Sequence, residues 1–160
     1  SLSENLLKSL RKYSQYIQIF SYPNSDSESN IILKHIKKYV SHNDNAILHQ
    51  SYGRIDYLHL LKYSEIIIGN SSSGFVEAPY LETPTVNIGT RQKGRPTTDS
   101  IFNSSYSAAS IISNINLALN YKNSRKNINY KGMGSVDKVM QILKTIKIDN
   151  IKNKSFVDIT

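Results

Sequence analysis

The segment 66–79 constrains the fold of this chain more than any other part of its sequence. Its apolar run of isoleucines ends in Gly69, a cluster of small hydroxyl residues follows up to Gly74, and Glu77 comes next. This order predicts a strand, a small polar loop and the start of a helix. The first N–H groups of a helix have no intrahelical partner, and the helix dipole favours an anion beside them. Because small side chains let a phosphate come close and serine hydroxyls add donors, the segment predicts a phosphate-binding loop.

Short predicted strands alternate with predicted helices along the whole chain. We expect strands at 16–20, 45–49, 65–68 (a buried strand), 85–88 and 100–102. We expect helices at 5–13, 31–40, 56–63 with Asp56 as N-cap, 74–81, 107–120 and 136–146. Such alternation is typical of right-handed βαβ units, which form a parallel sheet with helices on both faces. The prediction is an α/β fold, a Rossmann-like three-layer domain, and 160 residues allow one such domain.

The polar loops of this predicted sheet all follow strands. The loops at 21–27, 51–55, 69–74 and 89–99 each leave a strand's carboxyl end, where ligands bind in such folds. We therefore expect them to share one edge of one sheet. The last loop carries Arg91 and Arg95, whose planar, permanently charged groups indicate phosphate or carboxylate recognition.

Composition narrows the classes of function. The net charge of +8 fits a phosphate-rich partner, but it also fits AT-rich codons, which favour Lys, Asn and Ile. The lysines form no basic stripe, so nucleic-acid binding is the least favoured class. Without cysteine, disulfides and thiolate metal sites are excluded, and the histidines lack metal-ligand spacing, so we expect no metal and no cofactor. The sequence has no apolar run of about 20 residues and no signal-peptide pattern at its start, so we expect a cytoplasmic protein that does not enter a membrane.

Two spaced motifs carry a family resemblance. The first runs from Gly69 through the serines and Gly74 to Glu77-Ala78-Pro79, and the second is Pro84-x-x-Asn87-x-Gly89-x-Arg91-Gln92-x-Gly94-Arg95. Together they resemble the C-terminal half of UDP-N-acetylglucosamine 2-epimerases, most closely the hydrolysing branch. Shorter matches extend the resemblance over nearly all 160 residues: Tyr22-Pro23-Asn24, Arg54-x-Asp56-Tyr57, Gly132-x-Gly134-Ser135 and Lys154-x-Phe156-Val157-Asp158-Ile159.

The resemblance implies a two-lobed, GT-B-like enzyme with a nucleotide sugar between two Rossmann-like lobes. It would convert UDP-N-acetylglucosamine, or a related UDP-sugar, and water to N-acetylmannosamine and UDP, for nonulosonic acid or surface polysaccharide synthesis. This chain would be the second lobe alone, as a single domain over 1–160. The N-terminal lobe of the same polypeptide would hold the catalytic carboxylates, so we assign no catalytic residue here and expect the chain alone to be inactive. Residues 136–160 would pack toward that lobe. A second copy of the protein is a further partner to consider, in a homo-oligomer.

The resemblance also implies roles for single residues. Ser71 and Ser72 would hold the diphosphate, Gly74 would allow close backbone approach, Glu77 would accept from the ribose hydroxyls, and Arg91 would lie near the nucleotide. It assigns UDP binding to the following residues: Asn24, Arg54, Ser71, Ser72, Gly74, Glu77 and Arg91. The role of Ser73 stays open.

Other interpretations remain at this point. A GT-B glycosyltransferase donor lobe would use a similar phosphate loop and glutamate but transfer the sugar to an acceptor. A non-enzymatic nucleic-acid-binding domain is the competing class. Each motif also has a structural interpretation: serine clusters form inert loops, Glu77 suits a helix dipole, and Arg91 with its basic neighbours suits a solvated loop.

Overall fold

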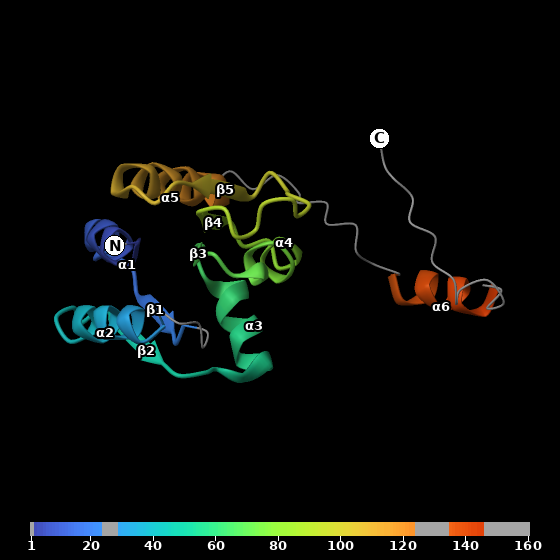
Figure 1. The fold of residues 1–160 in the computed structure, drawn as a ribbon, viewed down its shortest axis with the longest axis horizontal. Helices are drawn as coiled ribbons and strands as arrows, with labels where there is room; N and C mark the ends of the chain where they lie inside the picture. Colours follow the sequence, from blue (N-terminus) through green and yellow to red (C-terminus); the bar gives the residue numbers. More distant parts are fainter. Residues whose placement is uncertain (1, 24–28, 124–134, 146–160) are drawn as a thin grey trace. The chain divides into compact units, whose positions relative to one another are not determined.

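The computed structural model describes residues 2–23, 29–123 and 135–145 and divides the chain into two units, Ser1–Asn129 and Tyr130–Thr160. The first unit alternates strands and helices, as the sequence predicts (Figure 1). Its strands are β1 (Gln18–Ser21), β2 (Ala46–His49), β3 (Ile67–Gly69), β4 (Thr85–Ile88) and β5 (Ile101–Ser104). Its helices are α1 (Leu2–Leu10), α2 (Ser29–Val40), α3 (Gly53–Tyr63), α4 (Glu77–Tyr80) and α5 (Ala108–Asn123), with 3-10 turns η1 (Arg11–Tyr13) and η2 (Ser72–Gly74).

All strand pairs in the described residues are parallel, which confirms the α/β fold class. They form two sheets, with β1 beside β2 and with β4 between β3 and β5. The expectation of one sheet is therefore wrong within the described residues. The three residues of β3 pair with β4, and no described ladder joins β3 to β1. As a result, the loops after β3 and β4 follow neighbouring strands of one sheet, and the loops after β1 and β2 follow neighbouring strands of the other.

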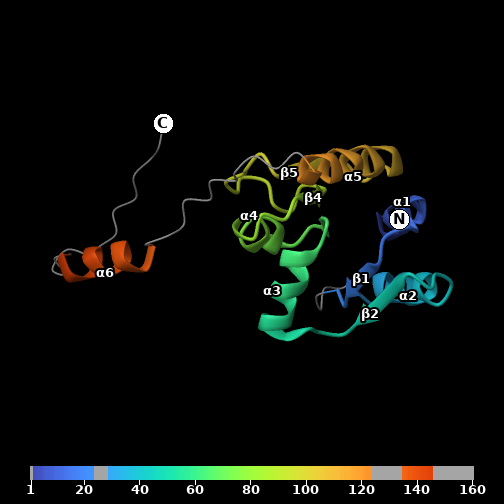
Figure 2. The ribbon, with the colours of Figure 1, turned by 180° about the vertical axis from the view of Figure 1, so that it is seen from behind.

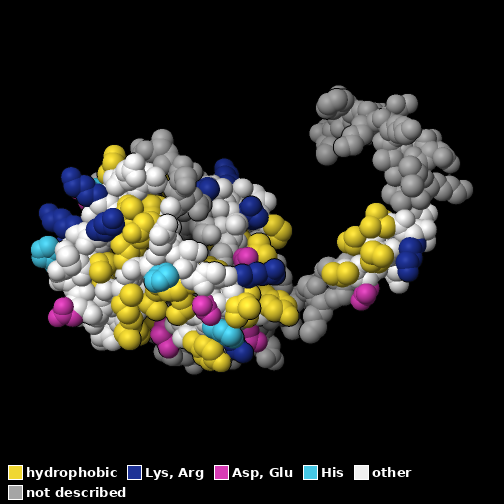
Figure 3. All heavy atoms as spheres, turned by 90° about the horizontal axis from the view of Figure 1, so that it is seen from below, with side chains coloured by type: hydrophobic (Ala, Val, Ile, Leu, Met, Phe, Trp, Pro, Cys, Tyr) yellow, Lys and Arg dark blue, Asp and Glu magenta, His cyan; other side chains and the backbone are white. Residues whose placement is uncertain are grey.

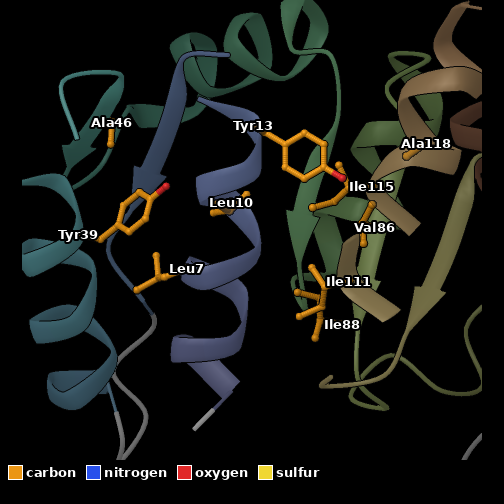
Figure 4. Close-up of a cluster of buried hydrophobic side chains, with 10 residues drawn as sticks. All are labelled: Leu7, Leu10, Tyr13, Tyr39, Ala46, Val86, Ile88, Ile111, Ile115 and Ala118. Atoms are coloured by element: carbon orange, nitrogen blue, oxygen red, sulfur yellow. The ribbon is translucent and has the colours of Figure 1, made fainter. Parts of the chain in front are cut away.

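One hydrophobic core nevertheless serves both sheets. Helix α1 contacts both α2 and α5, and its residues Leu7 and Leu10 are buried at helical spacing (Figures 1 and 4). The core also takes Ala46 from β2, Val86 from β4 and Ile115 from α5. Seen from behind in Figure 2, α2 lies against β2, and α5 lies against β4 and β5. Burial of these apolar side chains from distant segments is the main favourable contribution to folding.

The sheet of β1 and β2 departs from the expectation that helices cover both faces. Gln18 and Ala46 face the core and are buried, whereas Ile19 and Ile47, which pair with each other in the ladder, are 44% and 51% exposed. Hydrophobic side chains also reach the surface on the underside of this unit (Figure 3).

Among the helices whose bounds differ from the sequence prediction, α3 and α4 differ in how they begin. Helix α3 begins at Gly53, with Tyr52 as N-cap, so the prediction of Asp56 as N-cap is wrong. Gly53, the first residue of this helix, adopts φ +66°, a conformation that suits glycine. The helix expected at 74–81 is instead η2 followed by the four-residue α4. Glu82, at φ +60°, follows its end.

Strand β3, expected to be buried, is of intermediate exposure.

The second unit contributes one described helix, α6 (Ser135–Thr145). All its described side chains are exposed, and the hydrophobic ones gather along one side of the helix in Figure 3. Val136, Val139, Met140 and Leu143 follow the spacing of one helical face. The expected helix at 136–146 is thus confirmed, and its packing toward another lobe stays a prediction.

Among the helices of the described residues, none combines the length and apolarity needed to cross a membrane.

Candidate functional site

The segment 70–74, named here the serine turn, follows β3 and closes on itself. The Ser71 hydroxyl accepts from the Ser73 N–H at 3.3 Å and caps η2. The N–H groups of Gly74 and Phe75 donate to the carbonyls of Ser71 and Ser72, at 3.3 and 2.9 Å. The structure therefore differs from the expectation of free N–H groups at this place. Two short turns replace one long helix, and they use these donors internally. The exposed hydroxyls of Ser71 and Ser72 remain as the groups that this turn presents to solvent.

Gly74 has a packing role in the structure. It is buried, and a Cβ there would lie 2.5 Å from the Thr85 methyl carbon on β4. The Thr85 hydroxyl donates to the Gly74 carbonyl at 2.9 Å. Contact with β4 by itself requires glycine at 74, and the close approach to a ligand that the resemblance implies stays a prediction.

Tyr57 on α3 contacts the serine turn and lies near the charge of Glu77. Its hydroxyl lies 2.5 Å from the hydroxyl of buried Ser73. Burial raises the pKa of Tyr57 above its ordinary value, the hydrogen bond with Ser73 lowers it, and the charge of nearby Glu77 raises it. Glu77 is the first residue of α4 and is partly exposed, so its carboxylate is available to a ligand.

The segment 89–95, named here the arginine loop, follows β4. It starts at Gly89, where φ is +81° and a Cβ would overlap the Tyr106 ring, so glycine is required. Gln92 is 6% exposed, and its side-chain amide donates to the Asn70 carbonyl at 2.8 Å. This hydrogen bond joins the arginine loop to the serine turn. Arg91 is exposed and directly precedes Gln92, the residue that contacts the turn.

Two buried acceptors lie on β4 and in the arginine loop. The Asn87 side chain donates to the Asn103 side-chain oxygen at 2.8 Å, but its own Oδ1 has no partner among the described residues. The same holds for the Gln92 Oε1. Buried polar atoms of this kind are uncommon, and they are usually met by water or a ligand.

The remaining predicted residues are not brought to the turn by any described contact. Arg54 is the second residue of α3 and is exposed, one helical turn before Tyr57. Asn24 lies outside the described residues. Conversely, sequence reasoning gave no role to Tyr57 or Gln92, although both stand inside the motifs that carry the resemblance. In the part of the chain that the structure describes, no three histidine or acidic side chains gather so as to hold a metal ion.

Parallel strands joined by helices, with polar loops where β3 and β4 end, define a Rossmann-like α/β domain. Residues 3–144 match the family model described as UDP-N-acetylglucosamine 2-epimerase. The chain belongs to the UDP-N-acetylglucosamine 2-epimerase family.

Curated relatives support the same assignment. The chain is 32% identical over 98% of its length to a GDP/UDP-N,N'-diacetylbacillosamine 2-epimerase (hydrolyzing) of Campylobacter jejuni, of which it covers 42%. It is 36% identical over 88% of its length to a polysialic acid biosynthesis protein of Escherichia coli, covering 37% of it. It is 34% identical over 82% of its length to a UDP-N,N'-diacetylbacillosamine 2-epimerase (hydrolyzing) of Legionella pneumophila, covering 35% of it. The chain thus spans roughly two fifths or less of these relatives.

Proposed function

We propose that this chain is the UDP-sugar-binding lobe of a hydrolysing UDP-N-acetylglucosamine 2-epimerase. Its substrate would be UDP-N-acetylglucosamine or a close relative, which with water gives N-acetylmannosamine, or the related sugar, and UDP. The family match supports the reaction class, and the relatives with "hydrolyzing" in their names support that branch. The observation that carries the binding role is the hydrogen bond from Gln92 to Asn70, because it holds the serine turn and the arginine loop together.

The proposed chemistry explains these residue types. A diphosphate leaving group gains negative charge on its bridging oxygen while its bond to the anomeric carbon breaks. The hydroxyls of Ser71 and Ser72 and the guanidinium of Arg91 would stabilise that charge, because they are positioned before the reaction starts. Glu77, at the start of α4, would accept hydrogen bonds from the ribose hydroxyls. Asn24 and Arg54 are proposed as further UDP contacts.

The share of the relatives that the chain covers supports a second lobe elsewhere in the same polypeptide. In this proposal the N-terminal lobe supplies the acids and bases for proton transfer at C2 and water addition at C1. Helix α6, with its exposed hydrophobic face, would pack toward that lobe, since such a face is stabilised when a partner covers it. The enzyme would be cytoplasmic and would serve nonulosonic acid or surface polysaccharide synthesis.

Binding of UDP and of uridine by the complete gene product tests the assignment. Loss of a charged hydrogen-bond partner costs about 1.5–3 kcal/mol, so Arg91→Ala and Glu77→Ala should each weaken UDP about tenfold to hundredfold by calorimetry. Uridine, which lacks phosphates, should respond to Glu77→Ala but hardly to Arg91→Ala. Arg11→Ala, an exposed arginine before β1, is the matched control and should change neither. If Arg91→Ala weakens uridine and UDP equally, the phosphate assignment is wrong.

The reaction is tested separately, by incubating the complete gene product with UDP-N-acetylglucosamine or its diacetamido analogue. Release of UDP and of the free 2-epimeric sugar without any acceptor supports the epimerase. A strict requirement for an acceptor would favour the glycosyltransferase alternative instead.

A further inference from the structure

The serine turn is held at three places by side chains from three other segments. The Asn70 carbonyl at its start accepts from Gln92, and the Gly74 carbonyl at its end accepts from Thr85. Between these two ends, the Ser73 hydroxyl contacts the hydroxyl of Tyr57, which lies outside the turn on α3. Tyr57 therefore contacts the middle of the turn, while β4 and the arginine loop hold its ends.

The contact at Ser73 continues to Ser71. The Ser73 N–H donates to the Ser71 hydroxyl oxygen at 3.3 Å, so Tyr57 and Ser71 are connected through one residue. A hydroxyl that accepts a hydrogen bond still has its own hydrogen to donate. The hydrogen of exposed Ser71 is thus available to an anion, while buried Ser73, 8% exposed, has its hydroxyl engaged with Tyr57.

From this arrangement, and resting on the proposed function, we propose that Tyr57 is a positioning residue for the diphosphate. Its hydroxyl holds Ser73, and Ser73 in turn sets the direction of the Ser71 hydroxyl and the course of the turn that carries Ser72. Ser73 is accordingly an anchor of the turn and not a ligand of the phosphate. Affinity for an anion rises when its donors are fixed in the binding geometry beforehand, because less conformational freedom is lost on binding.

The electrostatics of the site agree with this role. Burial has the largest effect on the pKa of Tyr57 and raises it, and the nearby charge of Glu77 raises it further. The hydrogen bond with Ser73 lowers this pKa, but by less than burial raises it. Tyr57 therefore stays protonated and uncharged at neutral pH, and it adds no repulsion toward a bound diphosphate.

The test is Tyr57→Phe in the complete gene product, with Tyr63→Phe as the matched control. Tyr63 lies on the same helix and is 75% exposed. Loss of one hydrogen bond between uncharged groups should weaken UDP by about two- to tenfold. Uridine should bind as before, since it makes no phosphate contact. Ser73→Ala removes the same contact from the other side, so it should reproduce the effect, and the double variant should be no weaker than either single one.

The outcomes separate the hypotheses. UDP affinity equal to that of Tyr63→Phe overturns the inference, and so does an equal loss of UDP and uridine, because Tyr57 would then act through Glu77 or through the fold. If Tyr57→Phe unfolds, Ser73→Ala decides by the same comparison, with its thermal unfolding midpoint as the control for folding. If the unaltered protein binds neither UDP nor uridine, the proposed function itself is wrong, which is a different result from a failure of the Tyr57 variants alone.

Discussion

Single buried polar side chains hold the two loops of the candidate site, and Gln92 is the sharpest case. Its amide donates to the Asn70 carbonyl, 22 residues away in sequence. Gln92→Met keeps the volume but leaves that carbonyl without its donor. We expect a loss of about 0.5–1.5 kcal/mol in the free energy of unfolding, measured by urea denaturation, because Asn70 is exposed and water can meet its carbonyl. Lys93→Met, at the exposed neighbouring position, is the control. Equal stability of the two variants would contradict the role of this hydrogen bond.

Gly74 provides a second test at the residue scale. Gly74→Ala would place its Cβ against the Thr85 methyl group, so we expect a loss of about 1–3 kcal/mol from overpacking. Thr85→Ser removes that methyl group and keeps the hydroxyl that donates to the Gly74 carbonyl. The pair Gly74→Ala with Thr85→Ser should therefore recover stability in thermal unfolding. If the second substitution brings no recovery, contact with Thr85 is not the reason for glycine at 74.

At the scale of elements, η1 is joined to α5 by one tyrosine. The buried Tyr13 hydroxyl donates its one hydrogen to the Asn116 Oδ1 at 2.7 Å, with the Ile112 carbonyl as a second, longer acceptor at 3.2 Å. Burial, and to a lesser extent Tyr16, raises the pKa of Tyr13 above its ordinary 10.0. A raised pKa in the folded state means that this stabilisation is fully present below pH 10 and is lost as the pH rises through the folded-state pKa.

Tyr13→Phe should therefore lower the free energy of unfolding at neutral pH by about 0.5–1.5 kcal/mol, the usual net contribution of one hydrogen bond. The gap between the two proteins should shrink as the pH rises above about 10, as followed by urea unfolding at several pH values. Tyr63→Phe, at an exposed position, should show no such trend. The absence of a gap at neutral pH would contradict the link between η1 and α5, and a gap that persists unchanged well above pH 10 would contradict the titration of Tyr13 in the folded protein.

At the scale of the whole molecule, the proposed function predicts that this chain by itself binds UDP but does not turn over UDP-N-acetylglucosamine. A second lobe would close the cleft, exclude water and supply carboxylates, and a single lobe cannot replace these. Release of UDP from the nucleotide sugar by the purified chain, compared with the complete gene product, checks this. Sustained turnover by the chain alone would show that its own residues carry the chemistry.

Much of the fold follows from local sequence patterns. The strand at 85–88 has the predicted bounds, and the helix at 29–40 differs from its prediction only at the start, because apolar periodicity reports which side of an element meets the core. The serine turn and Glu77 were also singled out by sequence, since their residue types and order suit phosphate and ribose. Family membership was predicted from the two spaced motifs and is confirmed by the match over residues 3–144.

The tertiary structure decided what depends on residues far apart in the chain. The sequence indicated one sheet, whereas the strands of the described residues pair into two separate sheets. Aspartate suits a helix cap by its side chain, yet α3 begins at Gly53, before Asp56. The contact of Tyr57 with Ser73, 16 residues away, is likewise set by how the chain packs. Periodicity and motif describe neighbours along the chain, whereas these contacts form only when the packed core brings distant segments within hydrogen-bonding distance.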